Sequence, residues 1–158
     1  MHAFLTSRLD YCNILLSGIP DYQLNHIQRF QNTAARLITR TSKYDHITPV
    51  LEALHWLPVR QRISYKVLLF TYKIIYNLAP QYLSDLITER KTTRSLRSSN
   101  TTVLTKPMTN TQSYGGRSFS FMAPSLWNSL PPHIKSCQNY ETFKKKIKTH
   151  LFKEAFKK

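Results

Sequence analysis

The chain has 158 residues, of which 41% are hydrophobic and 12% aromatic, so its composition excludes a disordered protein and allows a buried core. Its formal net charge is +15, which favours polyanionic partners such as nucleic acid or an anionic membrane surface. Only three glycines are present, which is few for a sheet-rich fold with many tight turns.

The positive charge lies mainly in the second half of the chain. Residues 1–89 carry 9 Lys/Arg and 6 Asp/Glu, a net charge of +3, whereas residues 90–158 carry 14 and 2, a net charge of +12. We therefore expect an ordinary helical core in the first segment and a polyanion held by the second. The alternative is that the lysines only keep the chain soluble, because charge alone is weakly specific.

The first half of the chain shows the spacing of amphipathic helices. Residues 3–17 have a helical pattern, and Gly18 followed by Pro20 predicts its end. A second helix is expected over residues 21–38. Its apolar face repeats at intervals of three and four residues and consists of Leu24, Ile27, Phe30, Ala34 and Leu37.

Two further helices are expected before residue 80. Thr48 and Pro49 predict the N-cap and first turn of a short helix that ends near Leu54. Pro58 predicts the first turn of the longest helix, which extends to about Leu78. This helix is apolar on two faces, as is typical of a central helix in a bundle.

One more short helix is expected over residues 81–89. Residues 90–117 are rich in Ser, Thr and Asn and contain six Lys/Arg and no acid, which indicates an exposed linker. Thr102–Thr105 and Phe119–Met122 are candidates for the two strands of a short β-hairpin. A short helix over Pro124–Leu130 follows.

The last helix is expected from Tyr140 to Phe156. Its apolar stripe has spacings of three, four and four residues, and Lys146, Lys153 and Lys157 cluster away from that stripe. The fold class is therefore mainly α. We expect a helical bundle over residues 1–89, a basic linker over 90–117, and a C-terminal basic segment over 118–158 that ends in this amphipathic helix.

Three features bear on the compartment of the protein. Cys12 and Cys137 are far apart and have no CxxC partner, whereas secreted disulfide scaffolds are denser in cysteine. The N-terminal stretch has Arg8 and Asp10 among its apolar residues, unlike a signal or transit peptide. No segment reaches the length of about 18 apolar residues that a membrane span requires. We expect an intracellular protein, nuclear or cytoplasmic, that is not secreted and does not enter a membrane.

The acidic residues do not indicate a catalytic or metal site. No two of the eight are adjacent, whereas two-metal polymerases and nucleases need clustered carboxylates. Asp10 beside Tyr11 lacks the second Asp of a polymerase motif, so a surface or ion-pair role is favoured. The histidines lack zinc-ligand spacing, and neither a GxxxxGK[ST] loop nor a GxSxG elbow occurs. We expect no cofactor, no metal and no catalysis by this chain alone.

Several blocks of sequence carry a family resemblance when they are taken in order. They are SRLDYCNILLSGIP, IQRFQNTAARLITR, KYDHITPVLEALHWLPVRQRISYKVLLFTYK, LAPQYLSDLI, RSLRSS, YGGRSFSFMAPSLWNSLP and FKKKIKTHLF. From about Ala3 to Phe156, the ordered set closely resembles the C-terminal part of reverse transcriptases encoded by non-LTR (LINE-type) retrotransposons.

The resemblance implies the thumb and post-thumb region of an RNA-directed DNA polymerase, truncated before the catalytic palm. The family's aromatic-Ala-Asp-Asp motif has no counterpart here, so no catalytic residue carries over. Met1 falls where the family pattern continues upstream, so we expect an internal methionine and a truncated element or a fragmentary gene model. A thumb is a helical bundle that holds the template–primer backbone by phosphate contacts. The implied partners are RNA or DNA, bound independently of sequence, and the missing palm domain.

Ten basic residues are candidates for phosphate contact, with a solvated surface charge as the alternative for each. They are Arg36, Arg40, Lys43, Arg60, Arg62, Lys66, Arg94, Arg97, Lys146 and Lys153.

In the stretch HWLPVRQR, residues 55–62, we expect Trp56 and Leu57 to pack the junction between two helices. Two other functions stay open: a basic helical module that binds a protein or an anionic surface, and an inert pseudogene product with a marginal fold.

Overall fold

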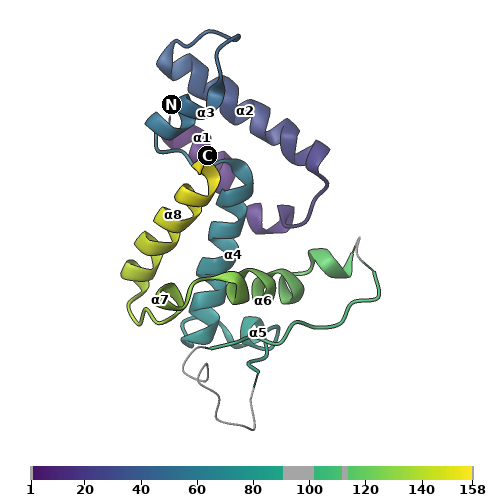
Figure 1. Ribbon diagram of the computed structural model, residues 1–158. Helices are drawn as coiled ribbons and strands as arrows, with labels where there is room; N and C mark the ends of the chain where they lie inside the picture. Colours follow the sequence, from purple (N-terminus) through teal and green to yellow (C-terminus); the bar gives the residue numbers. More distant parts are fainter. Residues whose placement is uncertain (1, 91–101, 112–113, 158) are drawn as a thin grey trace. The chain divides into compact units, whose positions relative to one another are not determined.

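The computed structural model describes residues 2–90, 102–111 and 114–157, with side chains from Thr6 onward (Figure 1). Within these ranges the chain forms helices α1 to α8 and two short 3-10 helices and contains no β-strand, which confirms the mainly α fold class. None of the helices in the described ranges is long and apolar enough to cross a membrane.

The chain divides into two compact units. The first unit comprises Met1–Tyr65 and Lys148–Lys158, and the second comprises Lys66–Ile147. Helices α4 (Val59–Ile75) and α8 (Tyr140–Phe156) contribute residues to both units. The sequence-based boundaries at residues 89 and 117 stay predictions.

The first unit contains four further elements. They are α1 (His2–Asp10), the 3-10 helix η1 (Asn13–Leu16), α2 (Asp21–Thr39) and α3 (Ile47–Ala53). Figure 1 shows α3 lying against α2, and side chains of both helices belong to one hydrophobic cluster.

Helix α1 is shorter than the sequence pattern predicts. The helix expected over residues 3–17 ends at Asp10, and a 3-10 turn follows it. Cys12 adopts the left-handed conformation, with a φ of 48°, and a right-handed helix cannot continue through such a residue. Gly18, with a φ of 74°, therefore lies beyond η1 and not at the end of α1.

Helix α2 has the expected bounds to within one residue but buries only part of the predicted face. Leu24, Gln31 and Ala35 are buried, whereas Phe30 and Leu37 of the predicted apolar face are 72% and 66% exposed. The prediction is confirmed for Leu24 and wrong for Phe30 and Leu37, because the buried side of α2 is held by amide hydrogen bonds and by a small residue that allows close packing. An apolar stripe alone does not reveal either contact.

Helix α3 ends in a Schellman motif that forms the start of the HWLPVRQR stretch. The helix begins at Ile47 after His46, so the predicted N-cap at Thr48 is wrong by two residues. At its end His55 is left-handed, with a φ of 53°. The His55 N–H donates to the Glu52 carbonyl at 3.0 Å, and the Trp56 N–H donates to the Leu51 carbonyl at 2.9 Å.

The same motif builds the core of the first unit. Leu51 and Trp56 pack together with Ala35 of α2, and Trp56 is only 4% exposed. A hydrophobic contact between these two positions commonly accompanies a Schellman motif. Leu57 is 5% exposed, so the prediction that Trp56 and Leu57 pack the junction is confirmed.

Two glutamines of α2 fix the start of α4. The Gln31 amide donates to the Leu57 carbonyl at 2.8 Å, and the Val59 N–H donates to Gln28 Oε1 at 2.8 Å. Gln28 also donates to Gln31 Oε1 at 3.0 Å. The Val59 N–H lies in the first turn of α4 and has no acceptor within that helix, so the side chain of Gln28 in α2 supplies the acceptor.

The second unit contains four further elements. They are α5 (Gln81–Ser84), the 3-10 helix η2 (Gly115–Arg117), α6 (Phe119–Ser129) and α7 (Pro132–Lys135). Helix α8 has the bounds that the sequence predicts. Helix α4 ends at Ile75, before the predicted Leu78, because Asn77 is left-handed with a φ of 54° and the Leu78 N–H bonds the Lys73 carbonyl at 2.7 Å. Helix α5 is also shorter than the expected 81–89.

The candidate β-hairpin does not form in the described residues. Phe119–Met122, expected as a strand, is the first part of α6. Leu104 instead forms an isolated antiparallel bridge with Glu89. The side chain of Asn128 in α6 acts as a second partner, because it accepts from the Leu104 N–H at 3.0 Å and donates to the Leu104 carbonyl at 2.8 Å.

Aromatic side chains form the centre of the second unit. The Tyr72 ring stacks on Tyr76 and Phe143 at centroid distances of 4.3 and 4.4 Å, and Phe143 lies 5.8 Å from Trp127. The Tyr72 hydroxyl donates to the Gln138 carbonyl at 2.6 Å. Burial raises the pKa of Tyr72, and the neighbouring Tyr76 adds to the shift.

Candidate functional site

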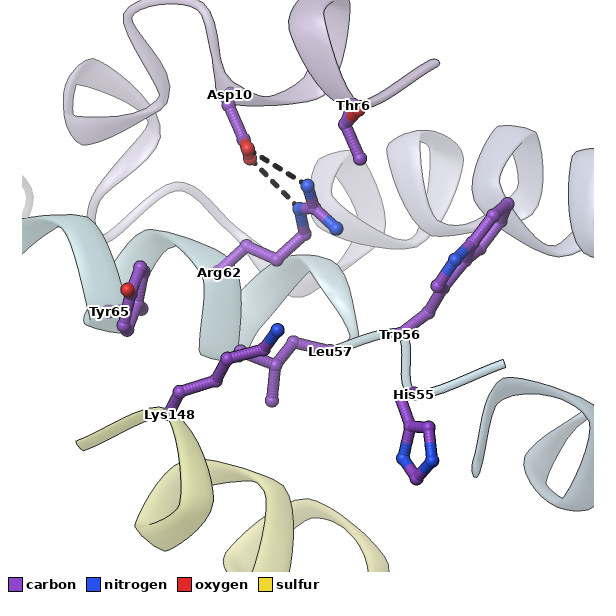
Figure 2. A pocket seen from close by; sticks show the side chains of 8 residues that line it. All are labelled: Thr6, Asp10, His55, Trp56, Leu57, Arg62, Tyr65 and Lys148. Carbon is purple, nitrogen blue, oxygen red and sulfur yellow. Dashed lines mark hydrogen bonds and ion pairs between the residues drawn. The ribbon is translucent and has the colours of Figure 1, made fainter. Parts of the chain in front are cut away.

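A pocket of about 170 Å³ opens in the first unit, beside the HWLPVRQR stretch. All of its lining residues belong to that unit. They are Thr6, Asp10, His55, Trp56, Leu57, Arg62, Tyr65 and Lys148 (Figure 2). The pocket therefore combines two basic side chains, one carboxylate and three aromatic rings.

The guanidinium of Arg62 is held in place by Asp10. Its Nε and Nη2 donate to the two carboxylate oxygens, each at 2.9 Å, and the two side chains are 12% and 31% exposed. This confirms the ion-pair role favoured for Asp10 from the sequence. The fork-to-fork geometry fixes the plane of the guanidinium and leaves Nη1 without a partner among the described residues. Figure 2 shows this third nitrogen pointing away from Asp10.

Lys148 supplies the second positive charge. It reaches from α8 toward the middle of the pocket, and its ammonium makes no hydrogen bond or ion pair with the described residues (Figure 2). Arg62 and Lys148 carry two positive charges and Asp10 carries one negative charge, so the pocket has a net charge of +1 with His55 neutral. The pocket is therefore suited to a small anion.

The backbone at the end of α3 positions two of the aromatic side chains that line the pocket, His55 and Trp56. The left-handed backbone at His55 directs the chain so that Trp56 turns into the core and His55 faces the other way. The His55 ring lies 5.6 Å from the Phe152 ring of α8. The backbone that carries these rings is fixed in turn by Gln31, which donates to the Leu57 carbonyl.

Three of the ten candidate phosphate contacts are arginines with intramolecular partners. Besides the pair of Arg62 with Asp10, Arg60 forms an exposed ion pair with Asp21. Arg36 donates to the carbonyls of Ser42 and Asp45, the latter at 2.7 Å, and so closes the loop after α2.

The other described candidates have no ion pair with the described residues. Arg40, Lys146 and Lys153 are exposed and make no side-chain hydrogen bond or ion pair with the described residues. Lys43 lies over the ring of Tyr44 at 4.9 Å, and Lys66 is partly buried. Arg94 and Arg97 lie outside the described residues.

The residues that the sequence prediction missed are Lys148, Gln28 and Gln31. Lys148 was not a candidate because it is not part of the cluster of Lys146, Lys153 and Lys157. The glutamines could have been found from their spacing. Together with Leu24 and Ala35, they repeat at intervals of four, three and four residues, which places all four on one helix face.

Comparison with protein-family models, with curated protein sequences and with solved structures gave no match to this chain. Among residues 2–90, 102–111 and 114–157, no group of three or more His, Cys, Asp or Glu side chains is placed to hold a metal ion.

Proposed function

We propose that the chain is a nucleic-acid-binding, non-catalytic segment of a LINE-type reverse transcriptase, equivalent to its thumb and post-thumb region. In this proposal it holds the backbone of a template–primer duplex by phosphate contacts and reads no sequence. The basis is the ordered set of sequence blocks together with the net charge of +15. An intracellular location and an interaction with the missing palm domain belong to the same proposal.

The observation that carries the proposal is that four lysines in and directly after α8 are exposed and have no ion-pair partner among the described residues. Lys146, Lys148, Lys153 and Lys157 are exposed, and none makes an ion pair with the described residues. Lys146 lies in the second unit and the others in the first. A lysine ammonium on a flexible stem suits a phosphate backbone, because it can follow the charge without a fixed geometry.

A titration with an RNA–DNA duplex tests the proposal. Fluorescence anisotropy of a labelled duplex should report binding with little dependence on sequence, and log K should fall steeply against log salt, because bound counterions are released. A control titration uses anionic vesicles, since the alternative function is binding to an anionic surface. No binding of any oligonucleotide at micromolar protein and about 50 mM salt would contradict the proposal. Stronger binding to vesicles than to the duplex would favour the alternative.

A second assay tests the non-catalytic part of the proposal. The purified chain is incubated with primer–template, Mg²⁺ and deoxynucleotides, and extension of the primer is measured. We expect no extension, because the acids needed to hold two metal ions are not clustered in the sequence. Extension by a clean preparation would overturn this interpretation.

A further inference from the structure

We propose that the pocket beside HWLPVRQR binds one phosphodiester group of a nucleic-acid strand between Arg62 and Lys148. The inference rests on the proposed nucleic-acid binding and deepens it, because it assigns one phosphate to a defined site. The remaining exposed lysines then act as unspecific contacts to the rest of the backbone.

The charge of the pocket favours a phosphodiester. The two cations and one carboxylate give a net charge of +1, and each phosphate in a strand carries one negative charge. Asp10 occupies two donors of Arg62 at 2.9 Å and leaves Nη1 available, so a bound phosphate does not need to displace the carboxylate. The Lys148 ammonium brings three donors and no competing partner from the described residues.

The size and the walls of the pocket also fit a single group. A volume of about 170 Å³ is many times the roughly 10–15 Å³ that a single water molecule requires, which leaves room for a phosphate group. Trp56 and Leu57 line the pocket with small apolar edges of side chains that are 4% and 5% exposed. The fixed guanidinium lowers the ordering cost of binding, because its plane is already set by Asp10.

The two tryptophans of the chain provide a reporter and an internal control. Trp56 lines the pocket, whereas Trp127 lies in the second unit with its Nε1–H bound to the Thr102 carbonyl at 3.0 Å. The indole N–H signals of both are followed in ¹H–¹⁵N spectra while a dithymidine dinucleotide with one phosphodiester is added. We expect a saturable shift of the Trp56 signal and a constant Trp127 signal. A Trp56 signal that does not move would overturn the proposal.

A matched pair of variants separates the pocket from general electrostatic attraction. Lys148→Gln removes one of the two pocket cations, and Lys144→Gln removes an exposed charge of the same helix that lies outside the pocket and pairs with Glu141 at 3.5 Å. We expect Lys148→Gln to weaken dinucleotide binding by about tenfold, the effect of losing a hydrogen bond to a charged group. We expect Lys144→Gln to change it by less than about twofold. Equal effects of the two substitutions would contradict a defined site.

Two further ligands identify the source of the phosphate. The neutral methylphosphonate analogue of the dinucleotide should leave the Trp56 signal unchanged, because it carries no charge for the two cations. Inorganic phosphate should bind no more tightly than the dinucleotide. A Trp56 shift with inorganic phosphate and none with the dinucleotide would overturn the assignment to a strand.

The proposed function and this inference fail in different assays. A duplex that binds while the Trp56 signal stays constant contradicts the pocket and leaves the proposed function in place. A dinucleotide that binds through Lys148, together with a duplex that does not bind, contradicts the proposed function and leaves the pocket in place.

Discussion

The two units of the chain are stabilised by different kinds of contact. In the first unit, Gln28 accepts a hydrogen bond from the Val59 N–H, Gln31 donates to the Leu57 carbonyl, and Asp10 pairs with Arg62. A small apolar cluster adds to these polar contacts. In the second unit, stacked aromatic rings around Tyr72 fill the centre. When a polar contact is broken, the loss of stability depends on whether the remaining group keeps a hydrogen-bond partner. When an aromatic side chain is truncated, the loss depends on the volume of the cavity that is left. Substitutions should therefore act on the two units by different mechanisms.

The largest expected effect comes from emptying the aromatic centre of the second unit. Phe143 is fully buried and stacks on Tyr72, so Phe143→Ala should lower the free energy of unfolding by about 3–5 kcal/mol. Urea denaturation followed by circular dichroism measures this loss. The control is Phe70→Ala, because Phe70 is 39% exposed and should cost about 1 kcal/mol. Equal losses for the two variants would show that the stack is not the centre of the unit.

A smaller effect is expected when the ion pair of the first unit is broken. Asp10→Asn should lower the free energy of unfolding by about 2 kcal/mol, because the Arg62 guanidinium, 12% exposed, keeps its charge and loses its charged acceptor. Glu52→Gln is the control, since Glu52 is exposed and has no ion-pair partner among the described residues. If both variants unfold at the same urea concentration, the pair does not stabilise the first unit.

The third prediction concerns alkaline pH and the hydroxyl of Tyr72. Tyr72→Phe should cost about 1 kcal/mol near pH 7, because the hydrogen bond to the Gln138 carbonyl is lost. The fold raises the pKa of Tyr72 above its ordinary value of 10.0, so the folded state retains the phenol proton longer than the unfolded state does. This contribution to stability is complete below pH 10.0 and is lost as the pH rises through the folded pKa.

The measurement is the free energy of unfolding of both proteins between neutral and strongly alkaline pH. The difference between wild type and Tyr72→Phe should shrink as the pH rises. Burial lowers the pKa of Lys135, so this residue makes the free energy of unfolding rise with pH, opposite to Tyr72. The contribution of Lys135 is present in both proteins and cancels in their difference. A difference that stays constant would contradict the role of Tyr72 ionisation.

The smallest expected effect is a gain in stability at the end of α2. Arg40 is left-handed, with a φ of 54°, and its exposed side chain makes no hydrogen bond or ion pair with the described residues. Arg40→Gly should therefore raise the free energy of unfolding by roughly 0.5–1 kcal/mol, because glycine adopts this conformation without steric cost. Arg29→Gly is the control, since a glycine in the interior of α2 should destabilise the protein by about 1 kcal/mol. A loss of stability in Arg40→Gly would indicate a contact of Arg40 that the structure does not show.

The contrast between apolar packing and amide hydrogen bonds also explains which elements can be predicted from the sequence. The bounds of α8 follow from apolar residues at helical spacing, because Phe143, Ile147 and Leu151 do pack in the interior. The buried face of α2 does not follow from that rule, because its inner side contains Gln31 and Ala35. A buried glutamine is recognisable only when its partner is known, and the Leu57 carbonyl is 26 residues away.

Helix ends in this chain show a similar limit. The structure places residues with positive φ at Cys12, Arg40, His55 and Asn77, where a glycine is the usual signal. Without that signal the sequence predicts helices that are too long, as in the segments 3–17 and 58–78. The pocket was missed for a related reason, since its two cations, Arg62 and Lys148, lie 86 residues apart in the sequence.

The central claim is that the exposed lysines of the C-terminal segment bind nucleic-acid backbone. The most direct test compares the salt dependence of duplex binding for the wild type, for a variant with Lys146, Lys153 and Lys157 replaced by Gln, and for Arg60→Gln. Arg60 is paired with Asp21, so its replacement should have the smaller effect per charge. We predict that the triple variant binds more weakly and that its slope of log K against log salt is shallower by up to about three, one for each lysine. An unchanged affinity and slope in the triple variant would contradict the claim.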